Sequence, residues 1–181
     1  MKLLNKLLLG CLILGGSAAC GPGSEVADSS LKSVESINLK WMNADSADAV
    51  YKSDDHKSGI FVLEFYQDSC GPCNTNVSNV HTIAKEFKDE SRVQVLDVGI
   101  DSSPSKYKNW IRKHSPIHPV LMDQGGKLFR SLGMSATPTM VILDCNLNEV
   151  HRAVGGWAGS RMDTIRGVIN GQLTNECVRG E

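Results

Sequence analysis

The chain of 181 residues has the composition of an ordinary globular protein, with 41% hydrophobic and 22% charged residues, which excludes a disordered or fibrous chain. Lys and Arg together number 19 and Asp and Glu number 20, so the formal net charge is −1. Such an even balance lacks the basic surface typical of nucleic-acid binders, and no nucleic-acid partner is expected. The length fits one domain of about 100–150 residues with additional segments.

Residues 1–19 have the pattern of an export signal. Lys2 and Lys6 give a positive start, residues 7–16 are mainly apolar, and small residues follow at 17–19. The apolar run is shorter than the roughly 20 residues that a helix needs to span a bilayer. We therefore predict a signal peptide over residues 1–19 and an exported protein.

Cys20 follows these small residues directly and resembles the acylated cysteine of a bacterial lipoprotein signal, although Ser17 stands where Leu is commonest. The resemblance implies that lipid on Cys20 anchors the protein to a bacterial membrane, facing the periplasm or the cell exterior. Plain secretion after cleavage nearby is the alternative. The Gly- and Ser-containing composition that follows predicts a flexible tether over residues 20–44, before a folded domain over residues 45–181.

The patterns after residue 44 predict alternating helices and strands. A continuous apolar run over residues 60–66 is typical of a strand covered on both faces. In chain order we expect a helix-compatible segment at 45–57, strands at 60–66 and 92–100, a helix between them to about residue 88, helices at 105–114 and 127–132, a hairpin of 139–143 with 149–154, and a last helix around 162–169. This order predicts an α/β layered sandwich with a central mixed sheet.

Two cysteines separated by two residues lie where the first strand meets the first helix. Cys70, Gly71, Pro72 and Cys73 form a C-x-x-C motif, which in this context indicates a redox pair. Unpaired N–H groups and the helix dipole at a helix N-terminus stabilise an anion, so Cys70 is expected to be the thiolate nucleophile. Cys73, one turn further on, is expected to be shielded and to resolve the intermediate. Both are predicted catalytic residues.

Other roles for the motif fit its surroundings less well. A zinc site needs four ligands, and no second Cys or His pair has matching spacing. Covalent haem requires His after the second Cys, but residue 74 is Asn. A purely structural disulfide would close a very small loop and add little stability. We therefore expect neither a metal nor a cofactor.

The strand and motif over residues 61–73 resemble the active-site strand and helix of thioredoxin-fold proteins, and Ala-Thr-Pro-Thr at 136–139 resembles their cis-proline loop. The stretch from residue 118 to 156 is most similar to the TlpA/ResA group of exported, membrane-tethered thiol–disulfide oxidoreductases. The resemblance implies a thioredoxin-like three-layer sandwich. It further implies that Pro138 is cis, and that Thr137 pairs with an extended substrate segment beside Gly71 and Pro72.

The same resemblance places Glu64 where thioredoxins have a buried acid. Burial would raise the pKa of this carboxyl group, and Glu64 would exchange a proton with Cys73 through water; a solvated Glu at a strand edge is the alternative. Asp97 falls near the position of a Lys that assists that acid in thioredoxin. A carboxylate there would oppose ionisation of Glu64 if the two are close.

Cys145 and Cys177 remain in the predicted domain, and export permits a disulfide between them, with free thiols as the alternative. The remaining candidate ligands are interpreted as surface or helix-end histidines and as packing tryptophans: His56, His81, His114, His118, His151, Trp41, Trp110 and Trp157.

The leading hypothesis is therefore an enzyme, an oxidoreductase that exchanges disulfides with an exported client protein. Gly-Pro between the cysteines resembles the reducing thioredoxins and favours a reductase. The expected partners are a disulfide-containing client, a thiol electron donor and, through lipid, a membrane, with the protein itself a monomer. The alternative is a non-catalytic thioredoxin-fold binding module or a copper(I)-binding lipoprotein, since thiolates bind copper(I) well.

Overall fold

The computed structural model describes residues 31–180, and both the predicted signal peptide and Cys20 lie outside this range. One seven-stranded sheet runs in the order β2-β1-β5-β4-β3-β6-β7. The elements in chain order are β1 (Asn38–Trp41), β2 (Val50–Lys52), the short 3-10 helix η1 (Ser53–Asp55), β3 (Ile60–Tyr66), α1 (Gly71–Glu86), β4 (Val93–Gly99), α2 (Pro104–His114), β5 (Val120–Met122), α3 (Lys127–Ser131), β6 (Thr139–Leu143), β7 (Glu149–Val154) and α4 (Ser160–Leu173).

The sheet is mixed, as predicted. β3, β4 and β5 are parallel, whereas β6 is antiparallel to β3 and to β7, and β1 is antiparallel to β5 and to β2. Every residue of β3 is buried, which explains its continuous apolar sequence. The prediction of an α/β sandwich with a central mixed sheet is therefore confirmed.

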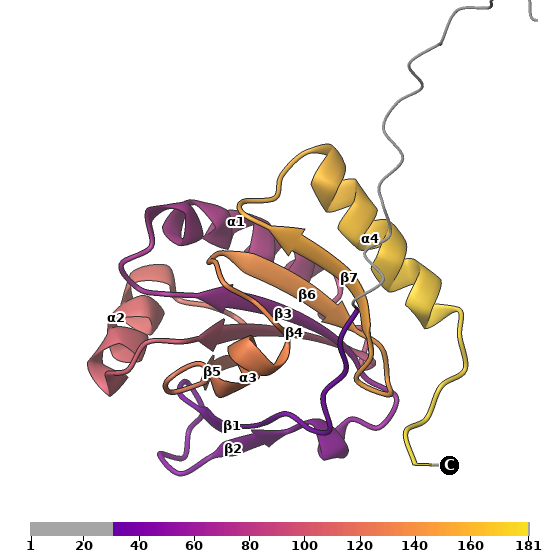
Figure 1. Ribbon diagram of the computed structural model, residues 1–181, viewed down its shortest axis with the longest axis horizontal. Coiled ribbons are helices and arrows are strands. Elements are labelled where there is room, and N and C mark those ends of the chain that lie inside the picture. The colour runs from indigo at the N-terminus through magenta and orange to yellow at the C-terminus, as the bar shows by residue number, and fades with distance from the viewer. Residues whose placement is uncertain (1–30, 181) are drawn as a thin grey trace, which may run out of the picture.

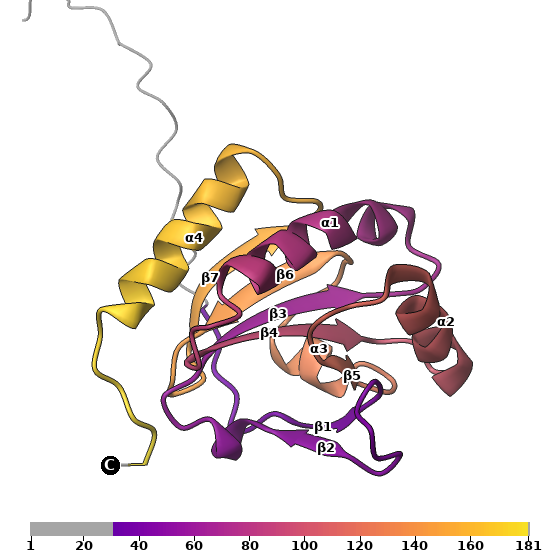
Figure 2. The same ribbon diagram turned by 180° about the vertical axis from the view of Figure 1, so that it is seen from behind.

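Helices cover the two faces of the sheet (Figures 1 and 2). On one face, Val80 and Ile83 of α1 and Ile165 of α4 pack with Ile60 and Val62 of β3. On the other face, α3 packs with alternate residues of the central strands in a second core formed by Leu63, Phe65, Leu96, Val98, Leu128 and Phe129. α2 lies beside the end of the sheet at which β3 and β4 finish (Figure 1). None of the helices among residues 31–180 is both long and apolar enough to cross a membrane.

The expected boundary of the folded domain at residue 45 is wrong. Ile37 is only 1% exposed, and residues 38–41 form β1, which pairs with both β2 and β5. Composition suggested a tether because polar residues alternate with the few apolar ones that the core buries. The segment 45–57, expected to be helix-compatible, instead contains β2 and η1, because pairing with β1 overrides its weak helical pattern.

Gly99, the last residue of β4, provides a test of this packing. A Cβ atom added there would lie 2.5 Å from Cε1 of Tyr107 and 2.9 Å from Cζ of Tyr66, both fully buried rings. Since overpacking costs about 1–3 kcal/mol, Gly99→Ala should lower the free energy of unfolding by that amount in urea titrations. Gly167→Ala is the control, because its Cβ would meet no atom within 4 Å. This substitution in α4 should be neutral or stabilising. Equal effects of both changes would contradict the packing described.

Candidate active site

The two cysteines of the motif lie at the beginning of α1. They are joined as a disulfide, with Cα atoms 5.2 Å apart. Cys70 caps the helix: the backbone N–H of Cys73 donates to Cys70 Sγ over 3.1 Å. Cys70 is half-buried, whereas Cys73 is 2% exposed. The helix therefore presents one sulfur of the pair to incoming molecules and shields the other.

The loop before β6 approaches this pair from a different part of the chain. The peptide bond between Thr137 and Pro138 is cis, and the carbonyl oxygen of Thr137 lies 3.6 Å from Cys70 Sγ. Gly155 N–H donates to the carbonyl oxygen of Pro138 over 2.8 Å, which ties the loop to the end of β7. The residues expected from sequence at this loop and at the motif thus meet in one place.

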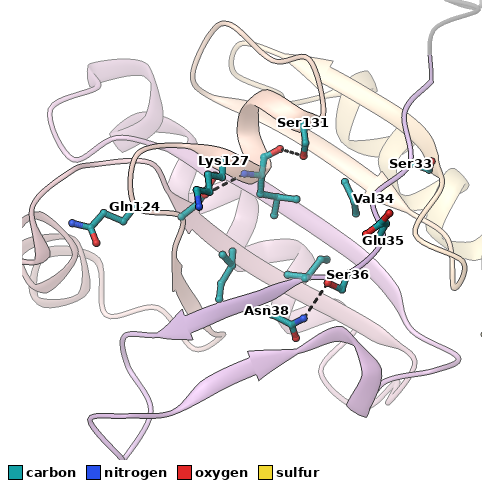
Figure 3. Close-up of a pocket in the computed structure, with 12 residues that line it drawn as sticks. Ser33, Val34, Glu35, Ser36, Asn38, Gln124, Lys127 and Ser131 are labelled. Atoms are coloured by element: carbon teal, nitrogen blue, oxygen red, sulfur yellow. Dashed lines mark hydrogen bonds between the residues drawn. The ribbon is translucent and has the colours of Figure 1, made fainter.

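Gly71 and Pro72 are exposed on the outer side of the motif. Pro72 borders a groove of about 280 Å³ that runs between α1 and the segment after β7, lined also by Thr75, Asn76, Asn79, Gly156, Trp157 and Ala158. A second pocket, of about 590 Å³, lies between residues 33–39 and α3 and includes none of the cysteines (Figure 3). The groove beside Pro72 also contains neither cysteine, but it adjoins the C-x-x-C motif through Pro72.

Glu64 lies in β3 under α1 and is 3% exposed, which overturns the alternative of a solvated strand-edge Glu. Asn76 Nδ2 donates to Glu64 Oε1 over 2.7 Å, and Trp157 Nε1 donates to Oε2 over 3.1 Å. Burial raises the pKa of Glu64 to about 8, even though these two donors lower it. Asp97, paired with Glu64 across β3 and β4, raises this pKa further, as its position in the sequence suggested. The site thus contains a buried carboxyl group whose pKa lies well above its usual range.

Residues of α2 hold the turn that carries Cys70, and sequence reasoning did not identify them. Asn74 Nδ2 donates to the carbonyl oxygens of Cys70 and Asp68, over 2.7 and 3.1 Å. From α2, Asn109 Nδ2 donates to Asp68 Oδ1 over 2.7 Å, and Lys106 Nζ lies 3.5 Å from Asp68 Oδ2. No periodic pattern signals the contacts of α2 with Asp68, because they join polar residues about 40 positions apart.

One interpretation of a single residue needs correction, and another is incomplete. His118 is not a surface residue: it is 7% exposed, with its ring 3.2 Å from Asp97. Trp157 packs in the core as expected, yet it also donates a hydrogen bond to Glu64.

Cys145 and Cys177 lie side by side, away from the motif, with Cα atoms 6.0 Å apart in a disulfide. Within residues 31–180, no group of three or more His, Cys, Asp or Glu side chains has the arrangement of a metal site.

Among curated proteins, the chain is 25% identical over 125 residues to the NHL repeat-containing protein 2 of Gallus gallus, covering 66% of this chain and 17% of the relative. It is 24% identical over 86 residues to the thiol-disulfide oxidoreductase ResA of Bacillus thuringiensis subsp. konkukian, covering 48% of this chain and 49% of the relative. The chain thus spans less than a fifth of the first relative and about half of the second.

Among solved structures, the fold matches the exposed lipoprotein thioredoxin Etrx1 of Streptococcus pneumoniae with a TM-score of 0.63 and 24% identity, over 75% of this chain and 98% of that one. The match shows that the fold is thioredoxin-like. At the level of sequence families, residues 23–150 match the AhpC/TSA family. With most of its length inside that match, and with a thioredoxin-like sheet carrying a C-x-x-C helix opposite a cis-proline loop, the chain belongs to the AhpC/TSA family.

Proposed function

We propose that this chain is an exported thiol–disulfide oxidoreductase that reduces disulfides in extracytoplasmic client proteins. The observation that carries this proposal is the unequal burial of the pair: Cys70 is reachable at the first turn of α1, and Cys73 is enclosed behind it. This asymmetry is what an attacking and a resolving thiol need. The activity named for ResA, a thiol-disulfide oxidoreductase, supports the same assignment.

In the reduced protein, Cys70 attacks as a thiolate. The N-terminus of α1 favours the anion, and the first turn of the helix contains no acidic residue that would oppose it. Cys70 sulfur bonds to one sulfur of the client disulfide, and the other client sulfur leaves as a thiolate. Cys73 then displaces the first client sulfur, so the Cys70–Cys73 disulfide forms and two electrons pass to the client. An external thiol donor restores the dithiol.

The client reaches Cys70 as an extended segment along the cis-proline loop. Thr137 is half-exposed beside Cys70 and offers its backbone to a passing strand, as peptide-binding proteins do at a sheet edge. The exposed residues Gly71 and Pro72 and the adjoining groove form the other side of this surface. Specificity for clients then depends on main-chain pairing more than on a deep pocket.

Glu64 acts as the acid–base group for Cys73 in this proposal. A thiol must lose its proton before it can attack, and Cys73 has little contact with solvent. Glu64 takes this proton when it is ionised, through an intervening water. Its pKa of about 8 suits that exchange at near-neutral pH.

Residues 1–19 direct export, and Cys20 carries the lipid that anchors the protein to a membrane. The pneumococcal Etrx1, an exposed lipoprotein thioredoxin, gives a precedent for this combination. In an oxidising compartment Cys145 and Cys177 form a second, structural disulfide that fixes the C-terminal segment to the turn between β6 and β7. The protein works as a monomer.

Replacing the nucleophile tests the central step. Cys70→Ser should abolish insulin reduction in the presence of dithiothreitol, because a hydroxyl cannot form the mixed disulfide. The matched control is the double variant Cys145→Ser and Cys177→Ser, which should retain the activity because that pair lies away from the active turn. Wild-type activity in the Cys70→Ser variant would contradict the proposal that Cys70 is the nucleophile.

Replacing the resolving thiol should trap the client. In Cys73→Ser the mixed disulfide cannot be resolved from within, so covalent complexes should accumulate in cells and run as higher-mass bands on non-reducing gels. Mass spectrometry of these bands identifies the clients. The double variant that also lacks Cys70 should show none, and equal trapping without Cys70 would mean that another thiol captures the partners.

The pKa of Glu64 predicts how stability depends on pH. The folded protein keeps a proton on Glu64 up to a pKa of about 8, above the ordinary value of 4.5. Between these values unfolding releases this proton, so the folded state loses stability as pH rises, by up to about 1.4 kcal/mol per unit. Urea titrations of the oxidised protein should show this slope, and Glu64→Gln should remove it. If the free energy of unfolding of Glu64→Gln fell with pH as steeply as that of the wild type, the raised pKa of Glu64 would be contradicted.

In the reductase assay, Glu64→Gln should be slower than the wild type by at least about tenfold.

A further inference from the structure

A second buried carboxyl group lies beside Glu64. Glu64 and Asp97 are register partners on the parallel strands β3 and β4, so their side chains lie on the same face of the sheet. Asp97 is 1% exposed, and no bulk water screens the two groups from one another. A negative charge on Asp97 therefore opposes ionisation of Glu64. A group that offsets the charge of Asp97 therefore lowers the pKa of Glu64 and increases the fraction of Glu64 that is ionised and able to accept a proton.

Two aromatic rings contact the oxygens of Asp97. Trp110 Nε1 donates to Oδ2 over 2.9 Å, and His118 Nε2 lies 3.2 Å from Oδ1. The indole of Trp110 does not titrate, so its contribution is constant. An imidazole ring, unlike an indole, can carry a full positive charge, and in His118 that charge would lie 3.2 Å from Asp97 Oδ1. His118 is thus the partner of Asp97 that can offset its charge.

His118 borders a pocket of about 260 Å³ beside the C-terminal part of α1 and the beginning of β4, although the residue itself is only 7% exposed. Among residues 31–180, neither ring nitrogen of His118 has a hydrogen-bond partner, and Asp97 Oδ1 has none either. The two side chains therefore lie in close contact, 3.2 Å apart, without a hydrogen bond between them. His81 of α1 and Asp97 of β4 face His118 directly. The other titratable or charged groups on the neighbouring elements are Lys85 of α1, Lys88 after it, Glu90 before β4, Glu64 and Tyr66 of β3, and His114 of α2.

We propose that His118 is a positioning residue of the thiol–disulfide reaction, which acts through Asp97 to control how readily Glu64 accepts the proton of Cys73. The inference rests on the proposed function for its chemistry. A positive charge on His118, 3.2 Å from Asp97 Oδ1, offsets the charge of Asp97. In the step concerned, the Glu64 carboxylate takes the Cys73 proton, the Cys73 sulfur bonds to the Cys70 sulfur, and the client sulfur leaves as a thiolate.

Three indole groups allow this proposal to be tested without measuring activity. Trp157 Nε1 donates to Glu64, Trp110 Nε1 donates to Asp97, and Trp41 Nε1 donates over 2.8 Å to Asn43, which carries no charge. In the oxidised, full-length chain labelled with ¹⁵N, neither Cys70 nor Cys73 titrates. The indole signal of Trp157 then follows the ionisation of Glu64, and that of Trp41 reports whether the fold is native.

We expect opposite shifts from the two members of the pair. Asp97→Asn should move the Trp157 midpoint to lower pH by about one unit or more, because it removes the like charge. His118→Leu should move it upward by a similar amount, and His118→Gln, which cannot carry a charge, should move it in the same direction. In Asp97→Asn, adding His118→Leu should have no further effect. The midpoint of the reductase rate against pH should follow the same order.

The control is His56→Gln, because His56 stacks on Tyr51, which belongs to the core on the opposite face of the sheet. This variant should leave the Trp157 midpoint where it is in the wild type. An unchanged midpoint in His118→Leu with a native Trp41 signal would overturn the proposal, as would a His118 effect that persists in Asp97→Asn. If His118→Leu does not fold, His118→Gln decides by the same criterion. A failure of the proposed function appears separately, as insulin reduction that does not depend on Cys70.

Discussion

The desolvation of one carboxyl group under helix α1 is the constraint on which the chemistry of this site depends. Glu64 would be an ordinary acid on the surface, but the strand that carries it is covered on both faces. Two donors, from Asn76 and Trp157, keep its oxygens hydrogen-bonded, so the buried group is satisfied without being fully stabilised as an anion. The outcome is a carboxyl group that holds its proton more tightly than an exposed acid does, with a pKa raised to about 8.

The same helix solves a second problem, which is to keep one sulfur reachable and the other enclosed. A helix N-terminus provides N–H groups for Cys70, and its first turn then carries Cys73 inward against Tyr66, Val77 and Trp110. Asn74 and the residues of α2 around Asp68 fix the turn from outside. The polar side chains that hold this turn, Asn74 and Asp68, both have hydrogen-bond partners.

The electrostatic balance around Asp97 distinguishes this chain from a thioredoxin with a Lys near that position. A carboxylate next to a buried acid is unfavourable unless a cation or donor accompanies it. Trp110 and His118 provide this compensation from two further elements, α2 and the segment before β5. His118 can act on Asp97 because the fold places the two side chains 3.2 Å apart, and not because of its neighbours in the sequence.

The sequence by itself determined the α/β class and the C-x-x-C motif at a strand–helix junction, because each depends on a local pattern: a continuous apolar run and a C-x-x-C spacing. The cis-proline at residue 138 was expected only from the resemblance of residues 136–139 to thioredoxin-fold proteins, and the structure has it. It misjudged where the folded domain begins, because the few apolar residues of positions 31–41 gain their role only by pairing with β5 and packing against the core. Only the tertiary structure decided that Asn76 and Trp157 hydrogen-bond Glu64 and that His118 lies against Asp97, since such contacts arise between residues distant in sequence and leave no periodic signal in any one segment.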